Sequence, residues 1–380
     1  MAEFTPMIHF VSGFLGSGKT TAIVGLCKAL EREGLRTAIV TNDQGRYQVD
    51  QAFVATGGIP SVAVSNGCLC CRYDDFEEKV LSLAENERPE VIFAESVGSC
   101  ADIVATVVKP FASFRGEHQP PGTLSTFVDA RMLEGRLSDR RLPFSDGVLY
   151  IFDKQIEEAE ILVLNKRDLL SEVRAKRLLA SAEERFPGKR TILHSALEEA
   201  DLRRWYDIAA SQVAHRTTGP ESLTEMDYEL YAEGERNLAW LDLSGTLAPR
   251  SGQPVTDAPE VLGALLWEFS GRLSAASLPV GHLKVIVRDS RGRGCKISLT
   301  GADSVLPEEV DEALSRQLPE ELAYPLELLL NARVMCDAKT LRQEFKEAAN
   351  ATEKAFGITL TIDREDAFLP GYPRPIHRLA

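Results

Sequence analysis

The sequence has no stretch of about eighteen consecutive apolar residues, so it predicts no helix that could cross a bilayer. The opening MAEFTPMIHFVSGFLG lacks the basic start and the sustained apolar run of a secretory signal. A Lys/Arg block is also missing, and the formal net charge of the 380 residues is -14. This charge argues against nucleic acid or an anionic membrane surface as a partner. Together these absences predict a cytoplasmic protein.

Cysteine is scarce, with seven in the chain, yet SNGCLCC holds Cys68, Cys70 and Cys71. In a reducing cytosol, clustered cysteines are more often metal ligands or redox groups than structural disulfides, and Cys70 and Cys71 could pair only through a strained ring. Gly67 gives the backbone freedom for a turn around one ion, and soft thiolates select Zn²⁺, Cu⁺ or Co²⁺. The cluster predicts a transition-metal site, with a buried apolar turn and a redox-active thiol set as the alternatives.

Short apolar runs alternate with helical patterns over about the first half of the chain. The runs are MIHFVSG (7–13), TAIVTND (37–43), VIFAES (91–96), LSTFVDA (124–130), EILVLNK (160–166) and TILHSA (191–196). Nearly continuous apolar strands that alternate with helices are typical of a mostly parallel sheet buried on both faces. We therefore expect an α/β domain.

The first connection, GFLGSGKT, fits the phosphate-loop pattern G-x-x-x-x-G-K-[ST] between a strand and a helix. Its glycines let backbone N–H groups converge on phosphates, and the helix N-terminus adds a favourable dipole. Lys19 would reach the β and γ phosphates, and the Thr20 hydroxyl would ligate Mg²⁺. A fortuitous glycine turn is the alternative. The expected nucleotide-binding residues of this loop are Gly13, Gly16, Ser17, Gly18, Lys19, Thr20 and Thr21.

The string NKRD, with Asn165, Lys166 and Asp168, follows the apolar strand EILVL. The Asp168 carboxylate can accept two hydrogen bonds from the N–H and amino groups on one edge of guanine, where adenine presents no such pair. A polar turn after a strand is the alternative. The place of NKRD on a late strand of a phosphate-loop domain favours GTP and GDP over adenine nucleotides.

Two carboxylates follow strands at the carboxyl edge of the expected sheet, where such folds bind ligands. Glu95 ends the strand VIFAE, and it could hold Mg²⁺ directly or through water, or position the attacking water. Asp43 in NDQG ends the preceding strand and could play a similar part. A strand-end turn or a helix cap is the alternative for each. The candidate catalytic residues are Lys19, Thr20, Asp43 and Glu95.

With GFLGSGKTT, NDQG, NGCLCC, ESVG and NKRD in this order, residues 5–200 resemble the CobW-like GTPases. These are relatives of the urease and hydrogenase maturation GTPases and of GTPases that serve cobalamin enzymes. The cysteine string lies between NDQG and ESVG as in that family. The resemblance implies a cytosolic GTPase that binds a transition metal, commonly zinc, and hands it to a client protein or uses it to prepare that client.

The resemblance also implies residue roles. It implies Gly16, Gly18, Lys19 and Thr20 for phosphate and Mg²⁺, Glu95 for Mg²⁺, Asn165, Lys166 and Asp168 for guanine, and Cys68, Cys70 and Cys71 for the transition metal. Relatives often dimerise, which leaves a homodimer open. Intrinsic turnover is expected to be slow, because no arginine finger can be assigned from the sequence.

The chain departs from the family pattern after Glu95, where the run SCADIVATVVKPF contains Cys100. Cys100 could approach the cluster as a fourth thiolate and close the site, or lie buried at the start of a helix, and we favour burial. The stretch from Asp43 to Glu95 contains both the expected Mg²⁺ groups and the cysteines. Loss of the γ-phosphate could therefore alter the metal ligands, and we expect metal affinity to depend on GTP versus GDP.

A chain of 380 residues exceeds what one hydrophobic core usually serves, so we expect two domains. The P-loop GTPase domain would occupy residues 1–213 and be followed by a polar linker, 214–236. Residues 237–380 would form a smaller α+β domain with an antiparallel sheet and helices near 259–276 and 338–356. This half has no histidine-rich tract and does not match the family's usual appended domain, and recognition of a client or partner is its expected role.

Three functions fit these observations. The first is a GTP-hydrolysing metallochaperone that delivers zinc, or another thiophilic ion such as Co²⁺, to a client metalloenzyme. The second is a GTP-dependent chaperone for a corrinoid (cobalamin) protein, although the sequence has no D-x-H-x-x-G string for that cofactor. The third is a GTP-dependent switch without metal transfer.

Overall fold

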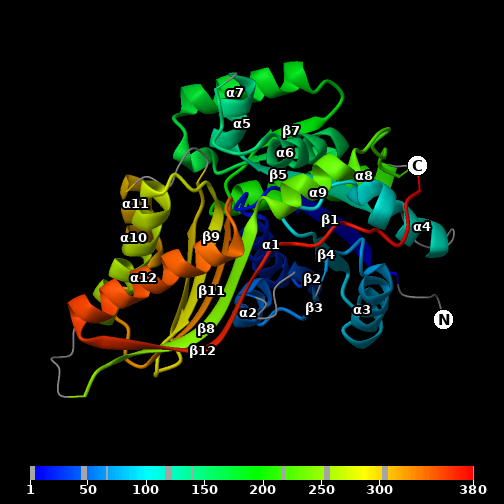
Figure 1. The fold of residues 1–380 in the computed structure, drawn as a ribbon. Helices are drawn as coiled ribbons and strands as arrows, with labels where there is room; N and C mark the ends of the chain where they lie inside the picture. The colour runs from blue at the N-terminus through cyan, green and yellow to red at the C-terminus, as the bar shows by residue number, and fades with distance from the viewer. Residues whose placement is uncertain are drawn as a thin grey trace.

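The structure is a computed structural model that describes residues 5–43, 49–65, 67–115, 122–138, 140–215, 219–251, 257–301 and 307–379. Two β-sheets lie side by side, and each is covered by helices (Figure 1). The first sheet belongs to the amino-terminal half of the chain and the second to the carboxyl-terminal half. The expected α/β domain followed by a smaller α+β domain is confirmed.

The first sheet has seven parallel strands in the order β3-β2-β4-β1-β5-β6-β7. They are β1 (Met7–Gly13), β2 (Thr37–Asp43), β3 (Ser61–Ser65), β4 (Val91–Glu95), β5 (Thr123–Asp129), β6 (Ile161–Asn165) and β7 (Arg190–Leu193). The sequence did not indicate β3, because SVAVS is short and half polar and so gives a weak strand signal. All parallel strands end at one edge, and the loops that carry the candidate site residues gather there.

Side chains alternate along a strand, so β1 sends Phe10 to one face of the first sheet and Val11 to the other. The Phe10 face is covered by α3, α4, α5, α6 and α7, and the Val11 face by α1, α2 and α8. These helices are α1 (Lys19–Arg32), α2 (Val49–Thr56), α3 (Tyr73–Asn86), α4 (Lys109–Arg115), α5 (Ala130–Leu137), α6 (Asp146–Glu158), α7 (Glu172–Arg185) and α8 (Glu199–His215). A π-helical turn, Val104–Val108, leads into α4.

Residues 214–236, which were expected to be a linker, include the helix α9 (Tyr228–Arg236). The Asp227 side chain caps it by accepting from the N–H groups of Glu229 and Leu230. The helix α9 packs so closely on α6 that a Cβ at Gly234 would lie 2.3 Å from the carbonyl oxygen of Gly147. The second part of this segment therefore belongs to the folded structure of the first domain.

The second sheet is antiparallel, with strand order β10-β9-β11-β8-β12. Its strands are β8 (Ala239–Pro249), β9 (Val280–Arg288), β10 (Gly294–Leu299), β11 (Leu326–Val334) and β12 (Ile358–Phe368), and its helices are α10 (Ala258–Ala275), α11 (Pro307–Gln317) and α12 (Ala338–Phe356). The hairpin between β9 and β10 and the two long helices follow the sequence prediction. The sequence did not indicate β11, whose residues, LELLLNARV, mix charged and apolar side chains.

The two faces of the second sheet differ in chemistry. One face packs its leucines and valines against α10, α11 and α12. The other face carries polar side chains toward the first domain, and among them are His282, Lys284, Asn331 and Arg333. The fully buried Arg333 guanidinium contacts Glu235 of α9 at 3.4 Å and lies 4.6 Å from the ring centroid of Trp240.

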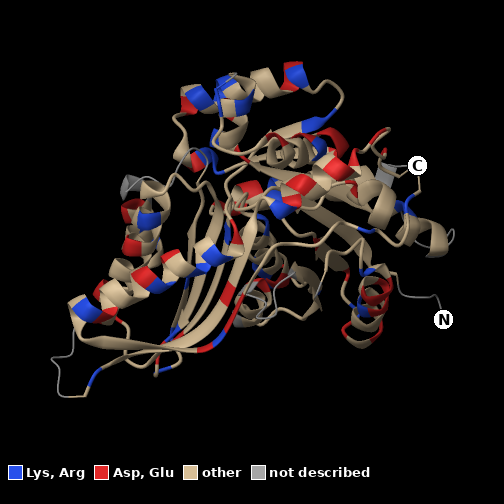
Figure 2. Ribbon diagram, viewed as in Figure 1, with Lys and Arg blue, Asp and Glu red and all other residues tan. Residues whose placement is uncertain are grey.

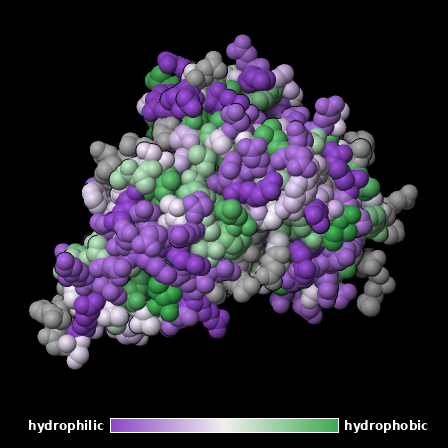
Figure 3. Space-filling model, in the orientation of Figure 1, coloured by the Kyte–Doolittle hydropathy of each residue, from purple (hydrophilic) through white to green (hydrophobic). Residues whose placement is uncertain are grey.

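Charged side chains lie mainly on the outer helices, for example α3, α7 and α12, whereas the strands carry few (Figure 2). On the face seen in Figure 3, hydrophilic side chains predominate and hydrophobic ones form separate patches. Among the helices of the described residues, none combines the length and the apolar character needed to span a membrane.

Candidate functional site

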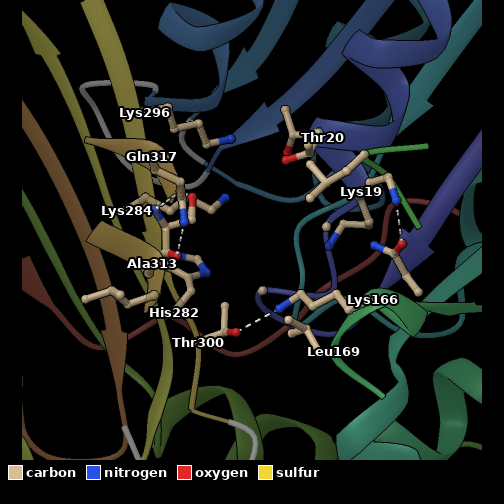
Figure 4. Close-up of a pocket in the computed structure, with 18 of the residues that line it drawn as sticks. Lys19, Thr20, Lys166, Leu169, His282, Lys284, Lys296, Thr300, Ala313 and Gln317 are labelled. Atoms are coloured by element: carbon tan, nitrogen blue, oxygen red, sulfur yellow. Dashed lines mark hydrogen bonds between the residues drawn. The ribbon is translucent and has the colours of Figure 1, made fainter. Parts of the chain in front are cut away.

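A cavity of about 440 Å³ lies between the carboxyl edge of the first sheet and the polar face of the second (Figure 4). Its walls come from the phosphate loop, from the loops after β6 and β7, and from β9, β10 and α11 of the second domain. Residues of the first domain in the lining are Gly16, Gly18, Lys19, Thr20, Thr21, Glu95, Asn165, Lys166 and Asp168, together with Phe53, Arg131, Leu169, Ala196 and Leu197. The structure thus brings the two expected halves of a nucleotide site into one cavity.

The phosphate loop depends on its glycines. Gly13, Gly16 and Gly18 have φ angles of 133°, 70° and 92°, which disfavour other residues. A Cβ at Gly13 would lie 2.0 Å from the Phe127 carbonyl oxygen. The Lys19 ammonium donates to the Gly13 carbonyl oxygen at 2.7 Å, and burial lowers the pKa of Lys19 to about 8. The loop therefore holds a buried cation where a phosphate would lie.

Three oxygen-bearing side chains meet beside this loop. The Thr20 hydroxyl donates to Glu95 at 2.9 Å and lies 3.3 Å from the Asp50 carboxylate. Within the described part of the chain, Glu95 Oε2 is buried without a hydrogen-bond partner. Burial, and then the charge of Asp50, raise the pKa of Glu95. A hydroxyl and two carboxylates fit a hard divalent cation such as Mg²⁺, which would also give the Glu95 Oε2 atom a partner.

Asp50 was missed by the sequence analysis, although it lies in the first turn of the helix that follows β2. Burial opposes its ionisation, but the ammonium groups of Lys284 and Lys296 hold the pKa of Asp50 below its ordinary value. Asp43, the residue expected at this position, ends β2, and its side chain lies outside the described residues. The available signal for Asp50 was an acidic residue shortly after NDQG, at the start of the next helix.

The base end of the cavity is built around NKRD. The Asn165 amide donates to the Ser17 carbonyl oxygen at 2.6 Å and accepts from the Ala196 N–H at 3.0 Å, so it links the phosphate loop to the loop after β7. The Asp168 carboxylate accepts from the Ser195 hydroxyl at 2.7 Å. Lys166, with φ of 63°, contacts Asp129 at 3.0 Å. Ser195 and Ala196 were not predicted from the sequence, because they lie just after β7 as part of the apolar run TILHSA.

The cysteine cluster forms a compact site. The sulfur atoms of Cys68, Cys70 and Cys71 lie within 4.8 Å of one another, and all three cysteines are free. A tetrahedral zinc ion would set sulfur–sulfur distances of about 3.8 Å. The Cys70 and Cys71 sulfurs are 3.9 Å apart, while those of Cys68 and Cys70 are 2.9 Å apart and would have to separate. Gly67, with φ of 154°, begins the turn, as expected.

Cys100 is fully buried, as favoured from the sequence, and it also lies beside the cluster. Hydrogen bonds, first from Cys100 and then from Cys70 and Cys71, hold the pKa of Cys68 well below its usual range. Among the four cysteines, Cys68 is therefore the one whose surroundings most favour the thiolate. The three sulfurs that lie within 4.8 Å of one another belong to Cys68, Cys70 and Cys71, and Cys100 is not part of that group.

The carboxyl-terminal segment after β12 runs back along the first domain and ends near α4 (Figure 1). The Arg374 N–H donates to the Cys71 sulfur at 3.3 Å, and the Ile376 N–H donates to the Cys70 carbonyl oxygen at 3.0 Å. The His377 ring lies between Tyr73 and Phe114, with both centroids at 4.9 Å. This segment therefore covers the side of the cluster at which Cys71 is partly exposed.

The Asn42 side chain holds the cysteine turn against the end of β2. Asn42, near the end of β2, donates to the carbonyl oxygens of Val64 at 3.0 Å and Gly67 at 2.8 Å. It accepts from the Leu69 N–H at 3.0 Å. Asn42 thus holds the cysteine turn, and its neighbour Asp43 leads into the segment that carries Asp50.

The amino-terminal half of the chain matches a known family. Residues 7–194 match the model described as "CobW/HypB/UreG, nucleotide-binding domain". The matched range contains the phosphate loop, the cysteine cluster, Glu95 and NKRD.

Similar proteins carry related names. The "Zinc chaperone CobW" of Sinorhizobium sp is 26% identical over 205 residues, covering 49% of this chain and 57% of that protein. The "Zinc-regulated GTPase metalloprotein activator 1" of Dictyostelium discoideum is 26% identical over 198 residues, covering 44% and 41%. The chain spans about half the length of these relatives. The solved Zn(II)-bound YjiA GTPase from E. coli aligns over 90% of this chain and 99% of that one, at 12% identity and a TM-score of 0.38.

The pKa of Lys19 predicts how the binding of polyphosphate depends on pH. Because this pKa is lowered to about 8, the ammonium is charged below pH 8 and loses its charge above it. We expect the affinity for GTP to fall roughly tenfold between pH 7.5 and 9.5, with proton uptake on binding near pH 8. Calorimetry in buffers of different ionisation enthalpy measures both. A Lys19→Met variant should bind weakly without this proton uptake, and equal uptake in both proteins would contradict the assignment.

The hydrogen bond from the Arg374 N–H to the Cys71 sulfur can be tested by a substitution that removes only this donor. The Arg374→Pro variant removes the donor to the Cys71 sulfur, whereas Arg374→Ala retains it. In protein loaded with Zn²⁺, we expect Arg374→Pro to lose the metal to a chelator roughly 10-fold to 100-fold faster, as for other groups that support metal ligands. Arg374→Ala should behave like the unaltered chain. Equal rates for the two variants would show that this contact does not support the ligand.

Proposed function

Because residues 7–194 belong to the CobW/HypB/UreG nucleotide-binding family, we propose that the protein is a GTP-hydrolysing metallochaperone. Its cargo would be a transition metal, zinc first, held by Cys68, Cys70 and Cys71. The observation that carries the proposal is the position of these three sulfurs, which lie within 4.8 Å of one another on a turn tied to β2 of the nucleotide-binding sheet. The reducing cytoplasm would keep the thiols available.

In this proposal, each group at the nucleotide site has a defined part. Lys19 would bind the β and γ phosphates, and Asp168 would accept from the guanine edge. Thr20, Asp50 and Glu95 would hold Mg²⁺, which neutralises charge on the phosphate oxygens when bound. Asn165 holds the phosphate loop and the loop after β7 together through its hydrogen bonds with Ser17 and Ala196. Glu95 can also position the attacking water, because it lies at the same edge.

The metal site would be open to exchange. Three protein thiolates leave a fourth position, which suits transfer to a client metalloprotein better than permanent storage. A cavity of about 520 Å³ borders Cys68 and Cys71 and extends between Tyr231, Glu235 and the carboxyl-terminal segment. A client ligand could approach through this cavity. The names of the similar proteins, a zinc chaperone and a metalloprotein activator, support a client of this class.

The proposal is tested by anaerobic titration of metal-free protein with Zn²⁺ and Co²⁺, in the presence of a GTP analogue or GDP. We expect one ion per chain, cobalt–thiolate absorption, and an affinity that differs at least about tenfold between the nucleotides. A Cys68/Cys70/Cys71→Ser variant should bind GTP but not the metal. Absence of thiolate-bound metal in the unaltered chain would refute the metallochaperone, and equal affinities would refute its nucleotide control.

Asn42 provides a separate test of the coupling between the sites. The Asn42→Ala variant removes the two hydrogen bonds, with Gly67 and Leu69, that hold the cysteine turn to β2, and a third to Val64 of β3. We expect it to bind GTP normally and to bind Zn²⁺ with an affinity that no longer depends on the nucleotide. A matched control is Asn86→Ala, which removes only an exposed amide on α3. Retained nucleotide dependence in Asn42→Ala would show that the coupling takes another route.

A further inference from the structure

The second domain contributes two lysines to the phosphate end of the cavity. Lys284 lies on β9 and Lys296 on β10, on the same polar face of the second sheet. In Figure 4 both point into the cavity across from Thr20 and Lys19. Neither lysine was predicted from the sequence, because a lysine in a β-hairpin of another domain belongs to no nucleotide-binding motif.

Both ammonium groups are largely withdrawn from water. The Lys296 side chain is 9% exposed and that of Lys284 is 14% exposed. The Lys296 ammonium lies 3.9 Å from the ring centroid of Phe53. Lysine is rarely buried unless anionic groups compensate its charge. The ammonium groups of Lys284 and Lys296 therefore need negatively charged groups beside them in the cavity.

Asp50 is the carboxylate that both lysines approach. Lys284 contacts its two oxygens at 2.7 and 2.9 Å, and Lys296 lies at 3.7 Å. The same carboxylate lies 3.3 Å from the Thr20 hydroxyl. In phosphate-loop enzymes that hydroxyl binds the Mg²⁺ that bridges the β and γ phosphates. The lysines thus lie at the end of the cavity where the γ-phosphate would be.

We propose that Lys284 and Lys296 bind the γ-phosphate of GTP and stabilise the charge that develops on it during hydrolysis. Mg²⁺ would attract the Asp50 carboxylate, and the γ-phosphate oxygens would replace it as the counter-charge of the lysines. The second domain would thereby supply, within one chain, the cation that related enzymes obtain from an arginine finger. GDP lacks these oxygens, so the second domain would distinguish the two nucleotides. The inference rests on the GTPase part of the proposed function and not on the metal.

The test compares Lys284→Met, Lys296→Met and the double variant in the full chain. With Mg²⁺ present, we expect the affinity for a non-hydrolysable GTP analogue to fall roughly 10-fold to 100-fold, and that for GDP less than about 3-fold. Single-turnover hydrolysis by the double variant should be slower by about 10³-fold, the lower end of the arginine-finger range. Lys339→Met, which removes an exposed lysine from the same domain, should change neither quantity.

Other outcomes distinguish binding of the γ-phosphate by the two lysines from a simple contact between the domains. If Lys284 only pairs with Asp50, the Met variants should weaken GTP and GDP binding equally, and Asp50→Asn should make the loss of Lys284 neutral. That result would overturn the inference, as would unchanged GTP binding in the double variant. The Lys284→Arg and Lys296→Arg variants keep the charge and should retain the preference for GTP even if the Met variants fold poorly. Failure of the unaltered chain to bind GTP would instead refute the proposed GTPase.

Discussion

The burial of a charged sheet face is the constraint on which the rest of the structure depends. The second sheet turns Lys284 and Arg333 toward the first domain, and an uncompensated buried charge costs several kcal/mol. Each cation therefore meets a carboxylate of the first domain, Asp50 or Glu235. These two carboxylates lie on α2 and α9, so the pairs fix the second sheet against both a nucleotide-site helix and the helix beside the cysteine cluster.

This arrangement makes the nucleotide cavity a property of both domains. A parallel sheet with a phosphate loop presents an open edge, and here the strands β9 and β10 cover that edge. Thr300, just after β10, shows how close the approach is, because a Cβ at Gly16 would lie 2.2 Å from its methyl group. Thr300 also accepts from the Lys166 ammonium at 2.8 Å, so one residue of the second domain contacts both the phosphate loop and the NKRD loop. Any nucleotide in the cavity would therefore contact the second domain.

The sequence predicted the features whose physical cause is local. The phosphate loop requires glycines with positive φ next to a lysine, and the cysteine turn requires Gly67 and three close thiols, so both are visible as short strings. Lys284 and Thr300 reach the site only through the packing of the two domains, and Asp50 only through the packing of α2 beside the phosphate loop. Their signal is a buried charge or a close contact, which a linear pattern does not contain. The helix α9 was hidden for a similar reason, since its docking depends on the contact between Gly147 and Gly234 rather than on an apolar run.

The two candidate sites are connected because the same two strands end between them. At the end of β2, Asn42 holds the cysteine turn, while the segment that follows leads to Asp50 beside Thr20. At the end of β4, Glu95 accepts from Thr20, and the continuing chain places Cys100 against Cys68. A well-packed sheet transmits small displacements because its strands cannot shift independently. A ligand that repositioned Asp50 or Glu95 would therefore act on the ends of the same strands that position the sulfur atoms.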